Sequence, residues 1–308
     1  MARKKKGDAI HGWVVIDKPI GMGSTPIVGR IKRKLNAQKA GHGGTLDPFA
    51  SGLLAIALGE ATKTVPWVMD GQKEYIFDIT FGEQRDSDDI EGNVIATSDI
   101  IPTTDDIKKV IPAFLGEIEQ IPPIYSALKV EGKRAYDLAR KGEDVQLKPR
   151  KVSLYDLELQ DSQTQGVMRF RAVTSKGFYI RALGRDLAKA CGALGYVSYL
   201  RRVASGKLSI NHAISLDKFE QLSYDAALKE ILPLETALDD ILVLALTADE
   251  AECVKYGQSL NANEIFARCG IDKANEGDIF LVKDQNIPLA LMFYNEGRLK
   301  TQRKFNIK

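Results

Sequence analysis

The chain has 308 residues, of which 44% are hydrophobic and 27% charged, a composition typical of soluble globular proteins. This length suffices for one large domain and a small one. The apolar run Leu53–Leu58 is far too short for a membrane span, and the basic start MARKKKGDAI precedes no apolar segment of a secretory signal. Three scattered cysteines, Cys191, Cys253 and Cys269, indicate reduced thiols, so we expect a cytoplasmic protein.

The net charge of +2 conceals a strong segregation of charge along the chain. Residues 1–64 carry 11 Lys and Arg against 4 Asp and Glu, and residues 121–207 carry 17 against 8. The other two segments are acidic, with 4 against 13 in residues 65–120 and 11 against 16 in residues 208–308. If the basic segments fold together, they form a positive face suited to a polyanion. Chance clustering of surface charge explains the pattern equally well.

A strand and a helix are the first elements expected. GWVVIDKP (12–19) predicts a short buried strand that ends at its proline. STP (24–26) then offers N-cap chemistry and a proline suited to a first helical turn. Apolar residues follow at helical spacing, namely Ile27, Ile31 and Leu35. The basic residues of this helix form either a solvated face or a phosphate-contacting face: Arg30, Lys32, Arg33 and Lys34.

The next segment contains two predicted strands and an acidic connection. We expect a buried strand at 53–58, a short helix after it, and a strand at 75–81 with one apolar face. The connection GEQRDSDDIEGN fails the calcium-loop pattern, because it lacks the central glycine and the distal glutamate. We therefore interpret its carboxylates as solvated loop residues, namely Asp86, Asp88 and Asp89. TTDD (103–106) predicts a capped helix that runs to about residue 115.

The second half of the chain alternates between strands and helices. A basic helix is expected at about 133–140, strands at 151–160 and 167–175, and a helix from about residue 181. SYLRRVASGKLSI predicts one or two further strands, and an acidic helical passage follows at 217–240. Short strands from about residue 242 indicate a separate small β-rich domain. This interleaving predicts an α+β protein whose strands need not be parallel.

The stretch AGHGGTLDPFASG (40–52) places a lone histidine and a lone aspartate among glycines. It is no P-loop, because no Gly-Lys-Ser/Thr follows. The three histidines, His11, His42 and His212, are too scattered to predict a metal site. The chain also has no GxSxG elbow and no GxGxxG dinucleotide motif. The remaining candidate is Asp47, a carboxylate on a glycine-supported loop in a chain with two basic segments.

This stretch resembles the catalytic loop of the bacterial tRNA pseudouridine synthases of the TruB family, which modify the T-loop uridine of tRNA (position 55). Further segments of the family occur in the same order over roughly the first 210 residues: DKPIGMGST, GEATK, KEYIFDITFG, IPPIYSALKVEGKRAYDLARKGE, SKGFYIRALGRDL and YLRRVASG. Two positions depart from the commoner pattern, which often has Thr or Ala at Gly43 and Thr at Gly23. Both lie beside key residues of the motifs and leave these residues in place.

The resemblance implies that Asp47 is the essential catalytic carboxylate and that Arg181 is the arginine paired with it. The reaction must cleave the glycosidic bond of uridine, rotate the base and rejoin it through C5. An ionised carboxylate could add to the base or to the sugar, or take a sugar proton, and the sequence leaves these routes open. The resemblance also implies that Tyr75 stacks on the target base and assists proton removal from C5.

His42 is implied to enter the space that the target base leaves when it turns out of the RNA stack. Stacking of its ring would replace part of the lost base stacking, worth about 1–3 kcal/mol per base. The resemblance further implies base contacts by Tyr179 and Leu200. Lys18 is expected to support the site or to contact the RNA backbone. The basic block 129–141, with Lys129, and the basic helix residues 30–34 are expected to meet phosphates.

The fold implied is that of a pseudouridine synthase, with a large mixed, mostly antiparallel sheet flanked by helices in residues 1–240. Residues 241–308 less clearly resemble a small PUA-like RNA-binding domain, which is the expectation for them, and a packing appendage explains them equally well. The expected partner is the T-arm of tRNA, and we expect a monomer that needs no metal, cofactor, protein partner or membrane. The main alternative is a tRNA-folding chaperone. An RNA-guided catalytic subunit is disfavoured because the chain begins about ten residues before the first motif without long basic extensions, and a phosphate-binding metabolic enzyme requires a coincidental match.

Overall fold

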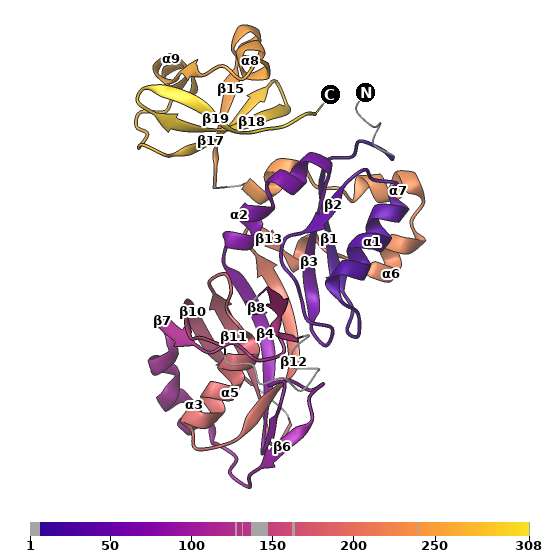
Figure 1. Cartoon of the computed structure of the whole chain (residues 1–308), viewed down its shortest axis with the longest axis vertical. Coiled ribbons are helices and arrows are strands. Elements are labelled where there is room, and N and C mark those ends of the chain that lie inside the picture. Colours follow the sequence, from indigo (N-terminus) through magenta and orange to yellow (C-terminus); the bar gives the residue numbers. More distant parts are fainter. Residues whose placement is uncertain are drawn as a thin grey trace.

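The computed structural model of the chain describes residues 7–126, 128–130, 132–136, 147–161, 164–238 and 240–307. Two sheets organise these residues, a large one in the body of the molecule and a smaller one near the C-terminus (Figure 1). The predicted α+β class is confirmed, because helices and strands interleave along the chain and the large sheet is mixed.

The large sheet is mostly antiparallel. Its main path runs in the order β14 (Ile214–Ser215), β1 (Gly12–Lys18), β3 (Ser51–Leu58), β12 (Gly195–Ser205), β4 (Lys73–Phe81), β11 (Val167–Thr174), β10 (Arg150–Gln160) and β7 (Gly116–Gln120). Two short strands extend it: β2 (Ala40–His42) on β3 and β13 (Leu208–Ser209) on β12. Among the described strands of this sheet, the β1–β14 and β3–β12 pairings are parallel and the others antiparallel. The chain thus joins two halves of the sheet along β3 and β12.

Helices cover the two halves separately, with α1, α6 and α7 beside β1 and β3, and α3 and α5 beside β4, β10 and β11 (Figure 1). Their bounds are α1 (Ser24–Lys34), α2 (Val65–Asp70), α3 (Thr104–Val110), α5 (Ile180–Ala190), α6 (Leu216–Gln221) and α7 (Tyr224–Lys229). The described residues of this part also form the 3₁₀ turns η1 (Gly59–Lys63), η2 (Ile111–Phe114), η3 (Ile210–His212) and η4 (Leu234–Leu238). The apolar face of α5 packs on β4 through buried Leu183 and Leu187, next to Phe77 and Ile79.

Two hairpins project from the large sheet. β5 (Glu83–Arg85) pairs with β6 (Val94–Thr97), and β8 (Lys129–Val130) pairs with β9 (Lys133–Arg134). The second hairpin contradicts part of the basic helix expected at 133–140, because Lys133 and Arg134 are in a strand; residues 137–140 lie outside the described residues. The cap predicted at Thr103 is confirmed, since its side chain accepts from the backbone N–H of Asp106.

The C-terminal domain is β-rich. Its sheet runs in the order β15 (Leu242–Leu246), β17 (Ile279–Asp284), β18 (Ile287–Asn295), β19 (Arg298–Lys304) and β16 (Leu260–Asn261), with helices α8 (Ala248–Lys255) and α9 (Ala262–Cys269). Leu281 and Phe305 pack in one apolar cluster with Trp13 of β1. The backbone N–H of Asn306 donates to Glu60 at 2.8 Å. The small domain is therefore docked on the large one, whereas the exact boundary at residues 240 and 241 stays a prediction.

The N-terminus of α1 differs from its prediction. Gly23, not Ser24, occupies the N-cap, and no side chain caps the helix. Arg30 and Lys34 of this helix bind α6, with Arg30 Nη1 3.4 Å from Glu220 Oε1 and Lys34 Nζ donating to the Glu220 carbonyl at 2.8 Å. Two of the four basic residues expected to contact phosphates, Arg30 and Lys34, therefore bind helix α6. Among the described helices, none has the length and apolar character needed to cross a membrane.

Candidate active site

The loop between β2 and β3 carries Asp47, and its backbone is held from three directions. The first support is Arg202 of β12, which is 2% exposed. Its guanidinium donates to the carbonyls of Gly44 at 3.0 Å and Thr45 at 3.4 Å, and its Nε donates to Leu53 at 2.9 Å. Gly52 must be a glycine here, because its φ is +96° and an added Cβ would lie 2.2 Å from the Arg202 carbonyl oxygen. The loop and β12 thus form one packed unit.

Ser24 and Lys18 fix the rest of the loop. The Ser24 hydroxyl bonds both backbone groups of Leu46, at 2.9 Å to the N–H and 3.1 Å to the carbonyl. Lys18 is fully buried, and its ammonium donates to the carbonyls of Pro19 at 2.9 Å, Met22 at 2.6 Å and Pro48 at 3.3 Å. Burial lowers the Lys18 pKa to about 8. This placement supports the loop and does not fit the RNA contact expected for Lys18, because the ammonium is enclosed by protein.

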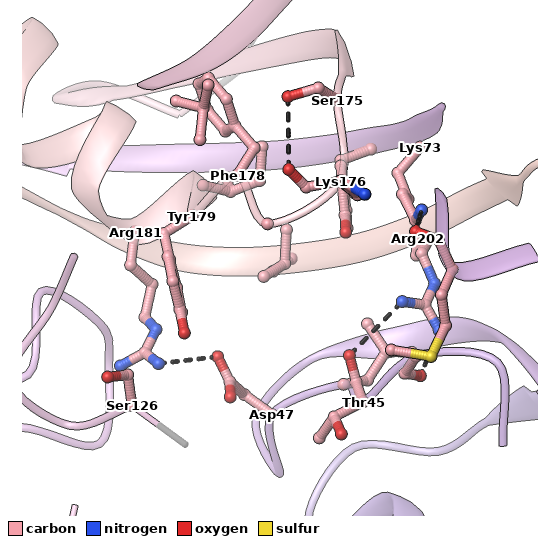
Figure 2. A pocket seen from close by; sticks show the side chains of 18 of the residues that line it. Thr45, Asp47, Lys73, Ser126, Ser175, Lys176, Phe178, Tyr179, Arg181 and Arg202 are labelled. Carbon is pink, nitrogen blue, oxygen red and sulfur yellow. Dashed lines mark hydrogen bonds and ion pairs between the residues drawn. The ribbon is translucent and has the colours of Figure 1, made fainter. Parts of the chain in front are cut away.

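Asp47 meets Arg181 at the start of α5. Arg181 Nη2 lies 3.0 Å from Asp47 Oδ2, and Figure 2 shows the two side chains pointing toward each other in the wall of the cavity. The same guanidinium donates to the carbonyls of Tyr125 at 2.8 Å and Ser87 at 3.1 Å. It also pairs with Asp89, with Nη1 3.0 Å from Oδ2. A helix terminus, a loop and a second carboxylate therefore fix the arginine in one position.

The acidic connection contradicts its interpretation as solvated loop. Asp88 and Asp89 are 6% and 3% exposed. Asp88 pairs with Arg185 at 2.8 Å, and Asp89 accepts from the Ser87 hydroxyl at 2.6 Å as well as from Arg181. Burial raises the pKa of each carboxyl, against the lowering effect of its arginine. These carboxylates anchor α5 to the loop because buried charges require partners.

Tyr179 stands directly before α5 and is held by Gln120 at the end of β7. The Gln120 side chain accepts from the Tyr179 N–H at 2.8 Å and donates to the Tyr179 carbonyl at 3.1 Å. Gln120 is 1% exposed, so the pair is shielded from water. The Arg150 guanidinium lies over the Tyr179 ring, 4.6 Å from its centroid. These two hydrogen bonds hold the start of α5 against the end of β7 and so help to place Arg181.

A cavity of about 540 Å³ opens beside Asp47 (Figure 2). The structure brings Asp47, Tyr75, Tyr179, Arg181 and Leu200 together in its wall. Its other walls include the loop glycines and the segment before α5, and its basic residues are Lys73, Arg150, Lys151, Lys176 and Arg202. This volume is in the range of small-molecule sites. The cavity therefore suits a planar ring attached to a polyanion.

His42 lies at the end of β2, before the loop, and is half-buried. The Gly44 N–H donates to its Nδ1 at 3.4 Å. Burial, together with the nearby Arg202 charge, lowers the His42 pKa, so the ring is neutral at pH 7. A Cβ at the neighbouring Gly43 would lie 2.7 Å from Val68 Cγ1, which explains the departure at this position. Lys129 is in β8, and its side chain lies outside the described residues.

The sequence does not predict the roles that Asp89, Arg202, Gln120 and Ser24 have in the site. Asp89 has the local sequence of a solvated acid in a turn-rich loop, and Gln120 belongs to no sequence motif that predicts a contact. Arg202 had a signal, since a second arginine interrupts a predicted strand in YLRRVASG. An alternating strand rarely buries a guanidinium without a fixed partner.

The fold places one carboxylate, paired with an arginine, in a cavity with aromatic and basic walls, an arrangement typical of an enzyme that acts on a polyanionic substrate. Residues 32–180 match the TruB family pseudouridylate synthase N-terminal domain, and residues 181–239 match the tRNA pseudouridylate synthase B C-terminal domain. The chain belongs to the TruB family of pseudouridylate synthases. Within the described ranges, no three His, Cys, Asp or Glu side chains are grouped to hold a metal ion.

Relatives match over most or all of the chain. A protein named tRNA pseudouridine synthase B from Rhodospirillum rubrum is 47% identical over the full length of both chains. Its namesake from Caulobacter vibrioides is 50% identical over 84% of each chain, and that from Bradyrhizobium diazoefficiens is 46% identical over 99% of this chain and 91% of the relative. A crystal structure of a Cbf5-Nop10-Gar1 complex has a chain 25% identical, with a TM-score of 0.72 over 96% of this chain and 84% of that one.

Proposed function

We propose that this protein isomerises the T-loop uridine of tRNA, position 55, to pseudouridine. The observation that carries the proposal is the Asp47–Arg181 pair, which faces a cavity lined by Tyr75, Tyr179 and Leu200. Full-length relatives named tRNA pseudouridine synthase B support tRNA as the substrate. The arrangement needs no cofactor, because the reaction moves one bond within one nucleotide.

Asp47 acts as the catalytic carboxylate, in one of three ways: by adding to the base, by adding to the sugar or by taking a sugar proton. Arg181 balances its charge and orients it inside a partly shielded cavity. The C1′–N1 bond breaks, the uracil turns between Tyr75 and Leu200, and a C1′–C5 bond forms. The C5 proton then leaves, and N1 gains a proton. Tyr75 assists removal of the C5 proton, and Tyr179 contacts the base.

The basic residues around the cavity hold the RNA backbone. Lys151 and Lys176 have side chains 71% and 65% exposed, and their partners are the surface carboxylates of Glu117 and Asp70. Such surface pairs are weak, so phosphates can replace the carboxylates. We propose Lys129 of β8 as a further phosphate contact, and His42, neutral at pH 7, fills the gap in the RNA stack. Residues 1–240 form the catalytic domain and residues 241–308 a PUA-like RNA-binding domain of a cytoplasmic monomer.

The test is tritium release from uridine labelled at C5, placed in an unmodified tRNA T-arm hairpin. Wild type and Asp47→Asn are compared without metal or guide RNA. Release by wild type alone is the expected result, because only the reaction that rejoins the base through C5 expels this label. Binding by both proteins without release by either would overturn the proposal and favour the RNA-chaperone function.

A further inference from the structure

A second hollow, of about 580 Å³, lies on the other side of the Asp47–Arg181 pair. Its wall comes from the acidic connection and from the segment around Tyr125. Among the described residues that line the two hollows, Asp47, Arg181 and Ser126 are the ones that line both. Two members of this trio form the candidate catalytic pair. The third, Ser126, has so far no role.

Ser126 is held in place by its backbone. Its N–H donates to the Ile124 carbonyl at 2.9 Å, and its own carbonyl accepts from the Tyr136 N–H at 3.1 Å. The residue is 4% exposed. Figure 2 shows its side chain at the Arg181 end of the cavity. The residue therefore has a fixed place in the wall of the cavity.

The Ser126 hydroxyl has no hydrogen-bond partner among the described residues, although it is buried. An unpaired buried polar atom destabilises the protein, and native structures contain few of them, usually with a specific reason. The Nε of Arg181 is also buried and unpaired. Two unsatisfied polar groups thus belong to residues of the same trio, beside the carboxylate. The Ser126 hydroxyl gains its missing partner if it turns toward a ligand in the cavity.

We propose that the Ser126 hydroxyl hydrogen-bonds to the target uridine and is a further catalytic residue of this enzyme. The inference rests on the proposed function. A hydroxyl suits this place because it can donate to a carbonyl oxygen of the base or accept from a ribose hydroxyl. The contact strengthens when the detached uracil carries negative charge, because hydrogen bonds to charged groups are the stronger ones.

The test is Ser126→Ala, with Thr174→Val as the matched control. Thr174 is completely buried, and its hydroxyl is likewise unpaired, but it lines none of the cavities described here. Tritium release is measured in single turnover with saturating enzyme, which separates the chemical steps from RNA binding. The melting temperature and the dissociation constant for the T-arm hairpin are measured on the same samples.

We expect Ser126→Ala to slow single-turnover release by about 10- to 100-fold, as for a lost hydrogen bond to a charged group. Its melting temperature and RNA affinity should equal those of wild type, and Thr174→Val should retain the wild-type rate. A wild-type rate for Ser126→Ala would overturn the inference. So would a fall in its melting temperature that accompanies the slower release, because the role would then be structural. No release by wild type would overturn the proposed function as well.

Discussion

Arg181 and Asp47 form an ion pair whose two members differ in exposure: the arginine side chain is 4% exposed and the aspartate side chain 37%. The protein encloses the cation with Asp89 and with two backbone carbonyls, so its charge cannot move away. The carboxylate remains open to the cavity. This asymmetry suits catalysis, because a preorganised charge needs no rearrangement when a reactive group meets its substrate.

Asp47→Asn should abolish tritium release while the RNA affinity stays within about threefold of wild type, because phosphate contacts dominate binding. The substitution removes a charge but almost no volume. Release and the dissociation constant for the T-arm hairpin are measured on one preparation. Residual release above that of enzyme-free RNA would show that another group performs the chemistry.

Asp89→Asn should slow release about tenfold or more, since Arg181 loses the carboxylate that fixes its second nitrogen. It should also lower stability by about 1–3 kcal/mol, because a buried charge loses its partner. The matched control is Asp88→Asn, whose partner Arg185 does not contact Asp47. Denaturant unfolding and release are compared for both variants. Equal losses of rate would show that both act only through stability.

Gly52→Ala should destabilise the protein by about 3 kcal/mol or more, because backbone strain adds to a clash with the Arg202 carbonyl. Gly116→Ala is the control. It has a similar φ of +90° but nothing within 4 Å of an added Cβ, so it should cost only about 1–2 kcal/mol. Thermal unfolding separates the two variants. Similar melting temperatures would show that β3 and β12 can move apart to accommodate the added methyl group without a loss of stability.

His42 should titrate below its ordinary pKa of 6.5, because burial and the Arg202 charge disfavour the imidazolium. The unfolded chain then binds the proton first as the pH falls, so the His42 contribution to stability is complete above pH 6.5 and is lost below it. A side-chain NMR titration of wild type, with His42→Ala to assign the signal, measures the midpoint. A midpoint at or above 6.5 would contradict this expectation.

His42→Ala should also lower the rate of tritium release in part, because the neutral ring no longer fills the gap in the RNA stack. Release is measured at pH 7, where the wild-type ring is neutral. A rate equal to that of wild type would count against the role of His42 in base flipping.

The elements that the sequence predicts best are those whose pattern of apolar and polar residues lies within the element itself. β1 and β3 are continuous apolar runs, and β4 alternates between apolar and polar residues, so each pattern matches a buried or half-buried strand. The sequence predicts the residues of the candidate site for a related reason. Contiguous motifs contain Asp47 among its glycines, Tyr75 and Arg181. A contiguous motif can be recognised without knowing which residues contact it in the folded protein.

The tertiary structure alone decided how polar side chains are paired. Ser24 has the local pattern of an N-cap, yet its hydroxyl bonds Leu46, 22 residues further along the chain. Asp89 has the local pattern of a solvated loop, yet it pairs with Arg181, 92 residues away. A hydroxyl or carboxylate has the same local preferences whether water or a distant residue is its partner. Which partner it takes depends on burial, and burial is set only when β3, β12 and α5 pack together.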